Sequence, residues 1–208
     1  RAAELEYLFD HASPALIIST QTRRDDLNAA SQKCGLNAPV CVFGQELFPL
    51  LHRDNAVVAK SAAGDAVEAA VLYTSGTTGK PKGCVLSNAY FLLAGRWYAE
   101  LGGIANLSTQ EERMITPLPI FHMNAMAYSF MAMVTVGGCL IALDRFHPKT
   151  WWSVVSDSRA TCLHYLGVMP SILMSLSTND LEQKHQVRFG FGAGVDPNLQ
   201  HDFETRFG

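Results

Sequence analysis

Short apolar runs that alternate with helix-like segments are the feature of this sequence that most constrains its fold. Residues 40–43, 69–73 and 139–143 form apolar runs of strand length, bounded by polar or turn-forming residues. The segments between such runs space their apolar side chains as a helix would, as Leu5, Leu8 and Phe9 do. Strands and helices that alternate in this way predict an α/β fold with a parallel sheet.

The pattern can be divided into elements along the whole chain. The predicted strands are 15–19, 40–43, 69–73, 84–86, 114–116, 139–143, 160–165 and 187–191. The predicted helices are 2–11, 25–33, 88–101 with Ser87 as its N-cap, 123–136, 148–158, 168–176 and a last one opened by Asp196 and Pro197. Residues 46–66 have scattered charges and little periodicity, which predicts a surface connection.

An uncharged stretch from Met114 to Leu143 resembles a membrane span, since it holds no Asp, Glu, Lys or Arg. Gly137 and Gly138 divide it, however, and polar side chains such as Asn124 interrupt its apolar surface. A helix packed on a sheet and followed by a buried strand explains the stretch more simply. We therefore expect no integral membrane span.

Charge and cysteine content narrow the partners and the compartment. The formal net charge of −3 comes without a basic stripe, which argues against nucleic acid and anionic membranes as partners. Five cysteines without a C-x-x-C pair form neither a disulfide framework nor a zinc set, and they indicate a reducing cytoplasm. Four of the seven histidines, His147, His164, His185 and His201, lack metal-ligand spacing among themselves, so no metal site is predicted from them. The chain begins at Arg1 without a secretory leader, and we expect a processed chain or an excised fragment.

Residues 74–83, with the sequence TSGTTGKPKG, carry the clearest chemical signal. Glycines let backbone N–H groups converge on an anion, hydroxyls donate to phosphate oxygens, and lysines add positive charge. The loop differs from the P-loop of common NTPases, which has the pattern G-x-x-x-x-G-K-[ST]. Thr74 occupies the position of the first glycine of that pattern, and Pro81 stands after Lys80 where the P-loop has Ser or Thr. Its composition is compatible with a polyphosphate cradle or with an ordinary Gly/Ser/Thr hairpin turn.

Three segments resemble motifs of the adenylate-forming enzymes, which include acyl-CoA synthetases, luciferases and peptide-synthetase adenylation domains. Residues 71–88 (VLYTSGTTGKPKGCVLSN) resemble the phosphate loop of that family. Residues 117–124 (PLPIFHMN) resemble its acyl-pocket motif, and residues 190–197 (GFGAGVDP) resemble the strand and turn along the adenine. The segment 145–176 is similar to the branch that includes carnitine and crotonobetaine CoA ligases.

The resemblance implies a fold and a division of the chain. Residues 1–66 would form part of an N-terminal αβ subdomain with a connection, and residues 67–208 a truncated AMP-binding region of the large N-terminal domain. The family's magnesium-binding Glu, ribose-binding Asp and mobile domain with its adenylation lysine are absent from these residues. The chain is therefore expected to be an internal slice that does not catalyse adenylation by itself.

The resemblance also implies roles for individual residues. Lys82, Thr77 and His122 would be catalytic, with His122 orienting the carboxylate beside Phe121 and Asn124 in the substrate pocket. The implied ATP-binding residues are Thr74, Ser75, Gly76, Thr77, Thr78, Gly79, Lys82, Gly192, Ala193 and Gly194. No residue is assigned to a metal.

The implied reaction activates a carboxylic acid with Mg²⁺-ATP to an acyl-adenylate and passes the acyl group to coenzyme A. Thr77 favours acyl-CoA ligases, and the Phe121–His122 region lacks the acid that peptide-synthetase domains use to hold an amine. Two alternatives stay open: an adenylation domain that loads a carrier protein, and a non-catalytic ATP-binding module. The implied partners are a small carboxylic acid, ATP and coenzyme A, and assembly of identical chains is compatible with the sequence.

Overall fold

The computed structural model describes residues 2–44, 64–74 and 79–208 and confirms the α/β class. The chain divides into two compact units, residues 1–61 and 62–208. Its strands are β1 (Ile17–Ser19), β2 (Val40–Val42), β3 (Glu68–Thr74), β4 (Lys82–Ser87), β5 (Arg113–Thr116), β6 (Cys139–Ala142), β7 (Cys162–Leu166) and β8 (Phe189–Ala193). Its α-helices are α1 (Ala2–Ala12), α2 (Arg24–Lys33), α4 (Asn88–Ala99), α5 (Met131–Val136), α6 (Trp151–Asp157), α7 (Val168–Ser175) and α8 (Gln200–Phe207). Short helical turns are η1 (Gln21–Arg23), η2 (Gly103–Ala105), η4 (Pro148–Thr150) and η5 (Pro197–Leu199), and η3 (Asn124–Phe130) is a π-helix.

The first unit is a small αβ layer. Strands β1 and β2 pair in parallel, and helices α1 and α2 contact each other and bury apolar side chains against the strands. The buried core of this unit consists of Phe9, Ile17, Ala30 and Val40. Most of the predicted connection at 46–66 lies outside the described residues.

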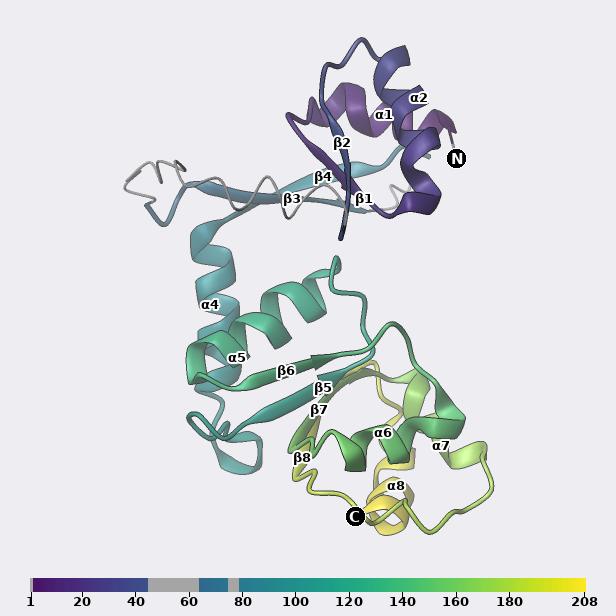
Figure 1. The fold of residues 1–208 in the computed structure, drawn as a ribbon. Helices are drawn as coiled ribbons and strands as arrows, with labels where there is room; N and C mark the ends of the chain where they lie inside the picture. Colours follow the sequence, from purple (N-terminus) through teal and green to yellow (C-terminus); the bar gives the residue numbers. More distant parts are fainter. Residues whose placement is uncertain (1, 45–63, 75–78) are drawn as a thin grey trace. The chain divides into compact units, whose positions relative to one another are not determined.

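A four-stranded parallel sheet is the centre of the second unit. Its order is β6-β5-β7-β8, and Figure 1 shows α4 and α5 on one face and α6, α7 and α8 on the other. Because successive side chains of a strand point to opposite faces, Met114 and Cys162 pack toward α5, while Ile115 and Leu163 pack toward α6 and α7. Trp151 and Trp152 of α6 are buried in the core that contains Ile115 and Leu163, so both have a packing role.

Strands β3 and β4 form an antiparallel hairpin, separate from the parallel strands of the sheet. Pairing continues to Thr74 and Lys82, so β4 begins two residues before the predicted start at Cys84. Ser87 caps α4 as predicted, because its hydroxyl accepts a hydrogen bond from the Tyr90 N–H at 3.3 Å. The hydroxyl-rich segment 74–83 is therefore also the connection of a β-hairpin.

The uncharged stretch contains a helix followed by a strand, as predicted, but the helix has two parts, and the strand, β6, lies at the edge of the sheet and is not buried. The π-helix η3 leads directly into α5, and Gly137 ends the helix with a left-handed φ of +68° before β6 begins. Within the described residues, no helix is long and apolar enough to cross a membrane. The π-helix was not predicted, because helical spacing of apolar residues does not distinguish it from an α-helix.

A buried ion pair holds the amino end of the sheet. Glu112 is 1% exposed and accepts hydrogen bonds from the Thr161 hydroxyl, the Ser108 N–H at 2.7 Å and Arg188 at 2.6 Å. Burial raises the pKa of Glu112, but the hydrogen bonds from Thr161, Ser108 and Arg188 outweigh it, so the pKa lies below its usual range. These contacts fix β5 to the segments before β7 and β8 at the end opposite the predicted site.

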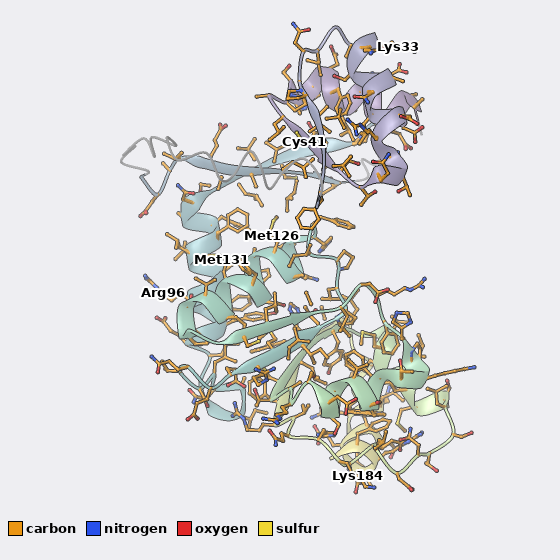
Figure 2. All side chains as sticks on the ribbon, in the orientation of Figure 1. Lys33, Cys41, Arg96, Met126, Met131 and Lys184 are labelled. Carbon is orange, nitrogen blue, oxygen red and sulfur yellow. The ribbon has the colours of Figure 1, made fainter. Side chains whose placement is uncertain are left out.

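Helix α4 approaches α5 at a glycine. A Cβ atom on Gly95 would lie 2.6 Å from the carbonyl oxygen of Met131, which is closer than real Cβ contacts allow. Figure 2 marks Met131 on α5 and Arg96, the neighbour of Gly95, on α4. The absence of a side chain at Gly95 thus permits the close packing of the two helices.

We predict that Gly95→Ala destabilises the protein although alanine is the better helix former. Helix propensity alone would add about 1 kcal/mol of stability, whereas overpacking against the Met131 backbone should cost about 1–3 kcal/mol. Urea unfolding of both proteins measures the difference. Gly64→Ala is the control, since a Cβ there meets nothing within 4 Å. A Gly95→Ala protein as stable as the unaltered one would contradict the packing argument.

Candidate functional site

The described residues of the phosphate-loop motif lie at the two ends of the connection between β3 and β4. Thr74 and Lys82 are directly opposite each other in the β3–β4 register, so their side chains leave the same face of the hairpin. Both residues are exposed. Gly79 has a left-handed φ of +90°, a conformation that side chains disfavour. Ser75, Gly76, Thr77 and Thr78 lie outside the described residues.

The predicted pocket motif follows the carboxyl end of β5. Phe121 is 76% exposed, and His122 is exposed beside it. The His122 ring is oriented by its own chain, because the Asn124 N–H donates to His122 Nδ1 at 3.4 Å. The Tyr90 hydroxyl of α4 contacts Met123 Sδ at 3.8 Å, which ties the motif to that helix. The motif thus presents an aromatic ring and an imidazole to solvent just before the π-helix.

The segment predicted as an adenine turn is mainly strand. Gly192 and Ala193 belong to β8 and pair with Tyr165 and Leu166 of β7, so only Gly194, with φ +67°, belongs to the turn. The prediction ended the strand too early because glycines usually mark turns. Here Gly192 has a packing reason as well, since a Cβ on it would lie 2.7 Å from the Tyr165 ring.

Gly167 is a site residue that the sequence analysis missed. Its N–H donates to the Ala193 carbonyl at 2.8 Å, and a Cβ on Gly167 would lie only 1.8 Å from the Gly194 carbonyl oxygen. The loop after β7 and the turn after β8 are therefore in backbone contact. A single glycine between a strand and a helix-like segment gave no signal that would have separated it from ordinary turn residues.

Parallel pairing brings two of the three predicted segments to one edge. Strands β5 and β8 both pair in parallel with β7, so the pocket motif, which follows β5, and residues 192–194, at the carboxyl end of β8, lie on the same side of the sheet. Among the described residues, no hydrogen bond joins Thr74 or Lys82 to either segment. The edge can hold a ligand that touches both segments, and the hairpin is a separate element of the candidate site.

A buried histidine lies beneath this edge. His164 of β7 is 2% exposed, and its Nδ1 lies 2.6 Å from the Ser129 hydroxyl of the π-helix. Its Nε2 lies 3.3 Å from the Tyr98 hydroxyl of α4. The Tyr98 ring in turn stacks on Phe191 of β8, with 4.1 Å between ring centroids. Burial lowers the pKa of His164 to about 4, so the imidazole is neutral at pH 7.

A cavity of about 600 Å³ occupies the other face of the sheet. It lies between β7, β8 and α8 and is lined by apolar side chains including Leu163, Phe203 and Phe207. It shares Gly190, Gly192, Val195 and Pro197 with the predicted adenine segment but none of the pocket-motif or hairpin residues. This cavity is a second candidate place for a ligand, on the face away from His164.

The chain belongs to the AMP-binding enzyme family, whose model matches residues 1–208. A very long-chain fatty acid transport protein of Saccharomyces cerevisiae is 31% identical over 137 residues, which cover 66% of this chain and 20% of that protein. A sulfoacetate–CoA ligase of Cupriavidus necator is 28% identical over 99% of this chain and 40% of its own length. The chain thus spans between a fifth and two fifths of these relatives.

Solved structures share the fold. The ATP-bound MatB of Rhodopseudomonas palustris superposes with a TM-score of 0.80 at 23% identity, covering 100% of this chain and 41% of that one. The N-terminal domain of FACL13 of Mycobacterium tuberculosis superposes with a TM-score of 0.81 at 18% identity, covering 98% of this chain and 51% of that one. These matches confirm the predicted fold, part of the N-terminal domain of an adenylate-forming enzyme.

We predict that Gly167→Ala disrupts the contact between the two loops at the sheet edge. The added methyl group cannot fit beside the Gly194 backbone, so one loop must move, at a cost of about 1–3 kcal/mol. Thermal unfolding should show a lower midpoint. Val168→Ala is the matched control, because the neighbouring Val168 side chain is 62% exposed. Equal midpoints for Gly167→Ala and the control would show that the loops do not depend on this contact.

The pKa of His164 predicts how stability depends on pH. The unfolded chain binds a proton at this histidine near pH 6.5, whereas the folded protein binds it near pH 4. The free energy of unfolding should therefore fall as pH decreases from 6.5 to 4, by up to about 3 kcal/mol from this group. Urea unfolding at several pH values tests this, with His164→Asn as the non-titrating comparison. Parallel pH profiles of the two proteins would contradict the assignment.

Proposed function

We propose that the whole protein containing this chain is an AMP-forming acid–thiol ligase that activates a carboxylic acid with ATP and transfers it to coenzyme A. The observation that carries the proposal is the shared sheet edge, where the pocket motif and the Gly192–Gly194 segment follow parallel strands. Membership of the AMP-binding family supports the same reaction, as does the similarity to the sulfoacetate–CoA ligase of Cupriavidus necator.

The hairpin offers the groups that a polyphosphate needs. Thr74 supplies a hydroxyl and Lys82 a positive charge on one face, and the loop between them contributes further hydroxyls and glycine N–H groups in sequence. In the proposed first step a carboxylate oxygen bonds to the α-phosphorus while the bond to the β-phosphate oxygen breaks. Lys82 and the loop donors would stabilise the charge on the departing pyrophosphate.

The sheet edge fits the other two parts of the reaction. The backbones of Gly167 and Gly194 meet without a side chain between them, and exposed backbone of this kind suits contact with a nucleobase. His122 and Phe121 are exposed on the neighbouring loop, where an imidazole could orient a carboxylate and an aromatic ring could line its path. Mg²⁺ would accompany ATP, because the oxygens of the nucleotide phosphates are ligands that this ion prefers.

We expect the first step to need more than these 208 residues. The relatives are longer, and removing one preorganised donor from such a site costs roughly 10²–10³ in rate. We therefore assign the activity to the whole protein and expect the chain alone to show no pyrophosphate exchange. The thiol acceptor is assigned to coenzyme A over a carrier protein on the names of the relatives.

Two variants of the whole protein should separate the two substrate sites. Lys82→Ala should raise the KM for ATP or lower kcat by about 10- to 100-fold, because a charged donor is lost. His122→Ala should change the kinetics of the acid while the KM for ATP stays nearly constant. Pyrophosphate exchange with acetate, butyrate, sulfoacetate, octanoate and palmitate measures both effects, and each variant is the control of the other.

The outcomes distinguish the proposed functions. ATP-dependent exchange with an acid, followed by thioester formation with coenzyme A, would support the ligase. Exchange without transfer to coenzyme A would favour a carrier-loading domain. Nucleotide binding without exchange for any acid would identify a non-catalytic ATP-binding module and contradict the proposal. Unchanged kinetics in Lys82→Ala would show that this lysine does not bind the phosphates.

A further inference from the structure

His164 joins three elements through polar contacts inside an otherwise apolar layer. The residue lies on β7, its Nδ1 meets Ser129 of η3 at 2.6 Å, and its Nε2 meets Tyr98 of α4 at 3.3 Å. Ser129 is itself fully buried. A buried imidazole with both nitrogens engaged is costly to arrange and rigid once satisfied, so its partners are held in a defined geometry.

One arrangement of donors and acceptors links all of these groups. In it the Ser129 hydroxyl donates its only proton to the Asn124 carbonyl at 3.3 Å and accepts from His164 Nδ1–H. The neutral imidazole then has an unprotonated Nε2, which accepts from the Tyr98 hydroxyl. Burial raises the pKa of Tyr98 to about 12, which keeps that hydroxyl protonated. Three hydrogen bonds therefore run in one direction, from Tyr98 to the Asn124 carbonyl.

The chain of hydrogen bonds ends at the first residue of the π-helix. Ser129 stands five residues after Asn124, so its bond spans the wide turn that a π-helix makes. The N–H of the same Asn124 donates to the His122 ring at 3.4 Å. Asn124 thus links the two histidines, because its carbonyl accepts from Ser129, the partner of His164, and its N–H donates to the His122 ring.

We propose that His164 is a positioning residue of the acid site, which acts through Ser129 to fix the start of the π-helix and the imidazole of His122. This inference rests on the proposed function, because it assigns His122 to the acid. It adds a residue that lies on another element and does not itself reach the sheet edge. The effect should appear in the KM for the acid and should spare ATP, whose predicted contacts lie on the hairpin and on β8.

If His164 only fills space in the core, its variants should give a different result. Loss of a packed side chain would lower stability and leave the kinetics of the folded protein unchanged. Cys162→Ala is the matched control, because Cys162 lies two residues earlier on the same strand and face, is fully buried, and has no contact with Ser129 or Asn124 in the hydrogen-bond chain. It loosens the same core without touching the network.

The kinetic test uses the whole protein and the acid that it activates best in the panel above. His164→Leu and Ser129→Ala should each raise the KM for that acid about tenfold or more, while the KM for ATP stays within about twofold. His164→Asn should restore most of the affinity, because its amide nitrogen stands where Nδ1 does, whereas His164→Gln should not. Cys162→Ala should leave both KM values unchanged.

A second readout does not depend on activity. Hydrogen–deuterium exchange of the amides from 122 to 130 should be faster in His164→Leu and Ser129→Ala, near normal in His164→Asn, and unchanged in Cys162→Ala. Amides of α6 should exchange equally in all variants. Faster exchange in a protein that activates no acid would support the anchoring and refute the ligase. Normal exchange in His164→Leu, or an unchanged acid KM in an active protein, would overturn the inference.

Discussion

The parallel pairing of β7 with β5 and β8 is the constraint on which the rest of the second unit depends. It aligns the carboxyl ends of strands that are far apart in sequence, so the loops after them meet at one edge. Contact between the Gly167 and Gly194 backbones then closes that edge, while the ion pair of Glu112 and Arg188 fixes the opposite end of the sheet. The strand pairing thus determines which residues a ligand can touch.

The two faces of this sheet differ in chemistry. The face toward α6, α7 and α8 is apolar and contains the cavity beside β8. The face toward α4 and α5 combines stacked aromatic rings with the buried polar chain through His164 and Ser129. A fully satisfied polar network inside a core specifies one arrangement of its partners more strictly than apolar packing does. This is a physical reason for the network to lie directly beneath the residues that we propose to orient the acid.

Sequence alone predicted the alternation of strands and helices, the caps of α4 and η5, and the fold of the uncharged stretch, because these depend on local pattern. It placed the end of β8 wrongly, since the glycines at 190 and 192 make room for Tyr165 of another strand. Gly167 and the His164 network escaped prediction for the same reason. Each depends on a partner that is distant in sequence, and no local spacing reveals it. The roles of Ser75, Gly76, Thr77 and Thr78 remain predictions, because they fall outside the described residues.

In the proposed function, one sheet edge holds both the nucleotide and the acid. A crystal structure of the whole protein with a stable acyl-adenylate analogue, an acyl-sulfamoyl adenosine, is the sharpest test of this arrangement. We expect the adenine against the backbone of Gly192–Gly194 and the acyl group within contact distance of His122, on the π-helix side of the sheet. An analogue bound in the cavity between β8 and α8, without contact to His122, would contradict it.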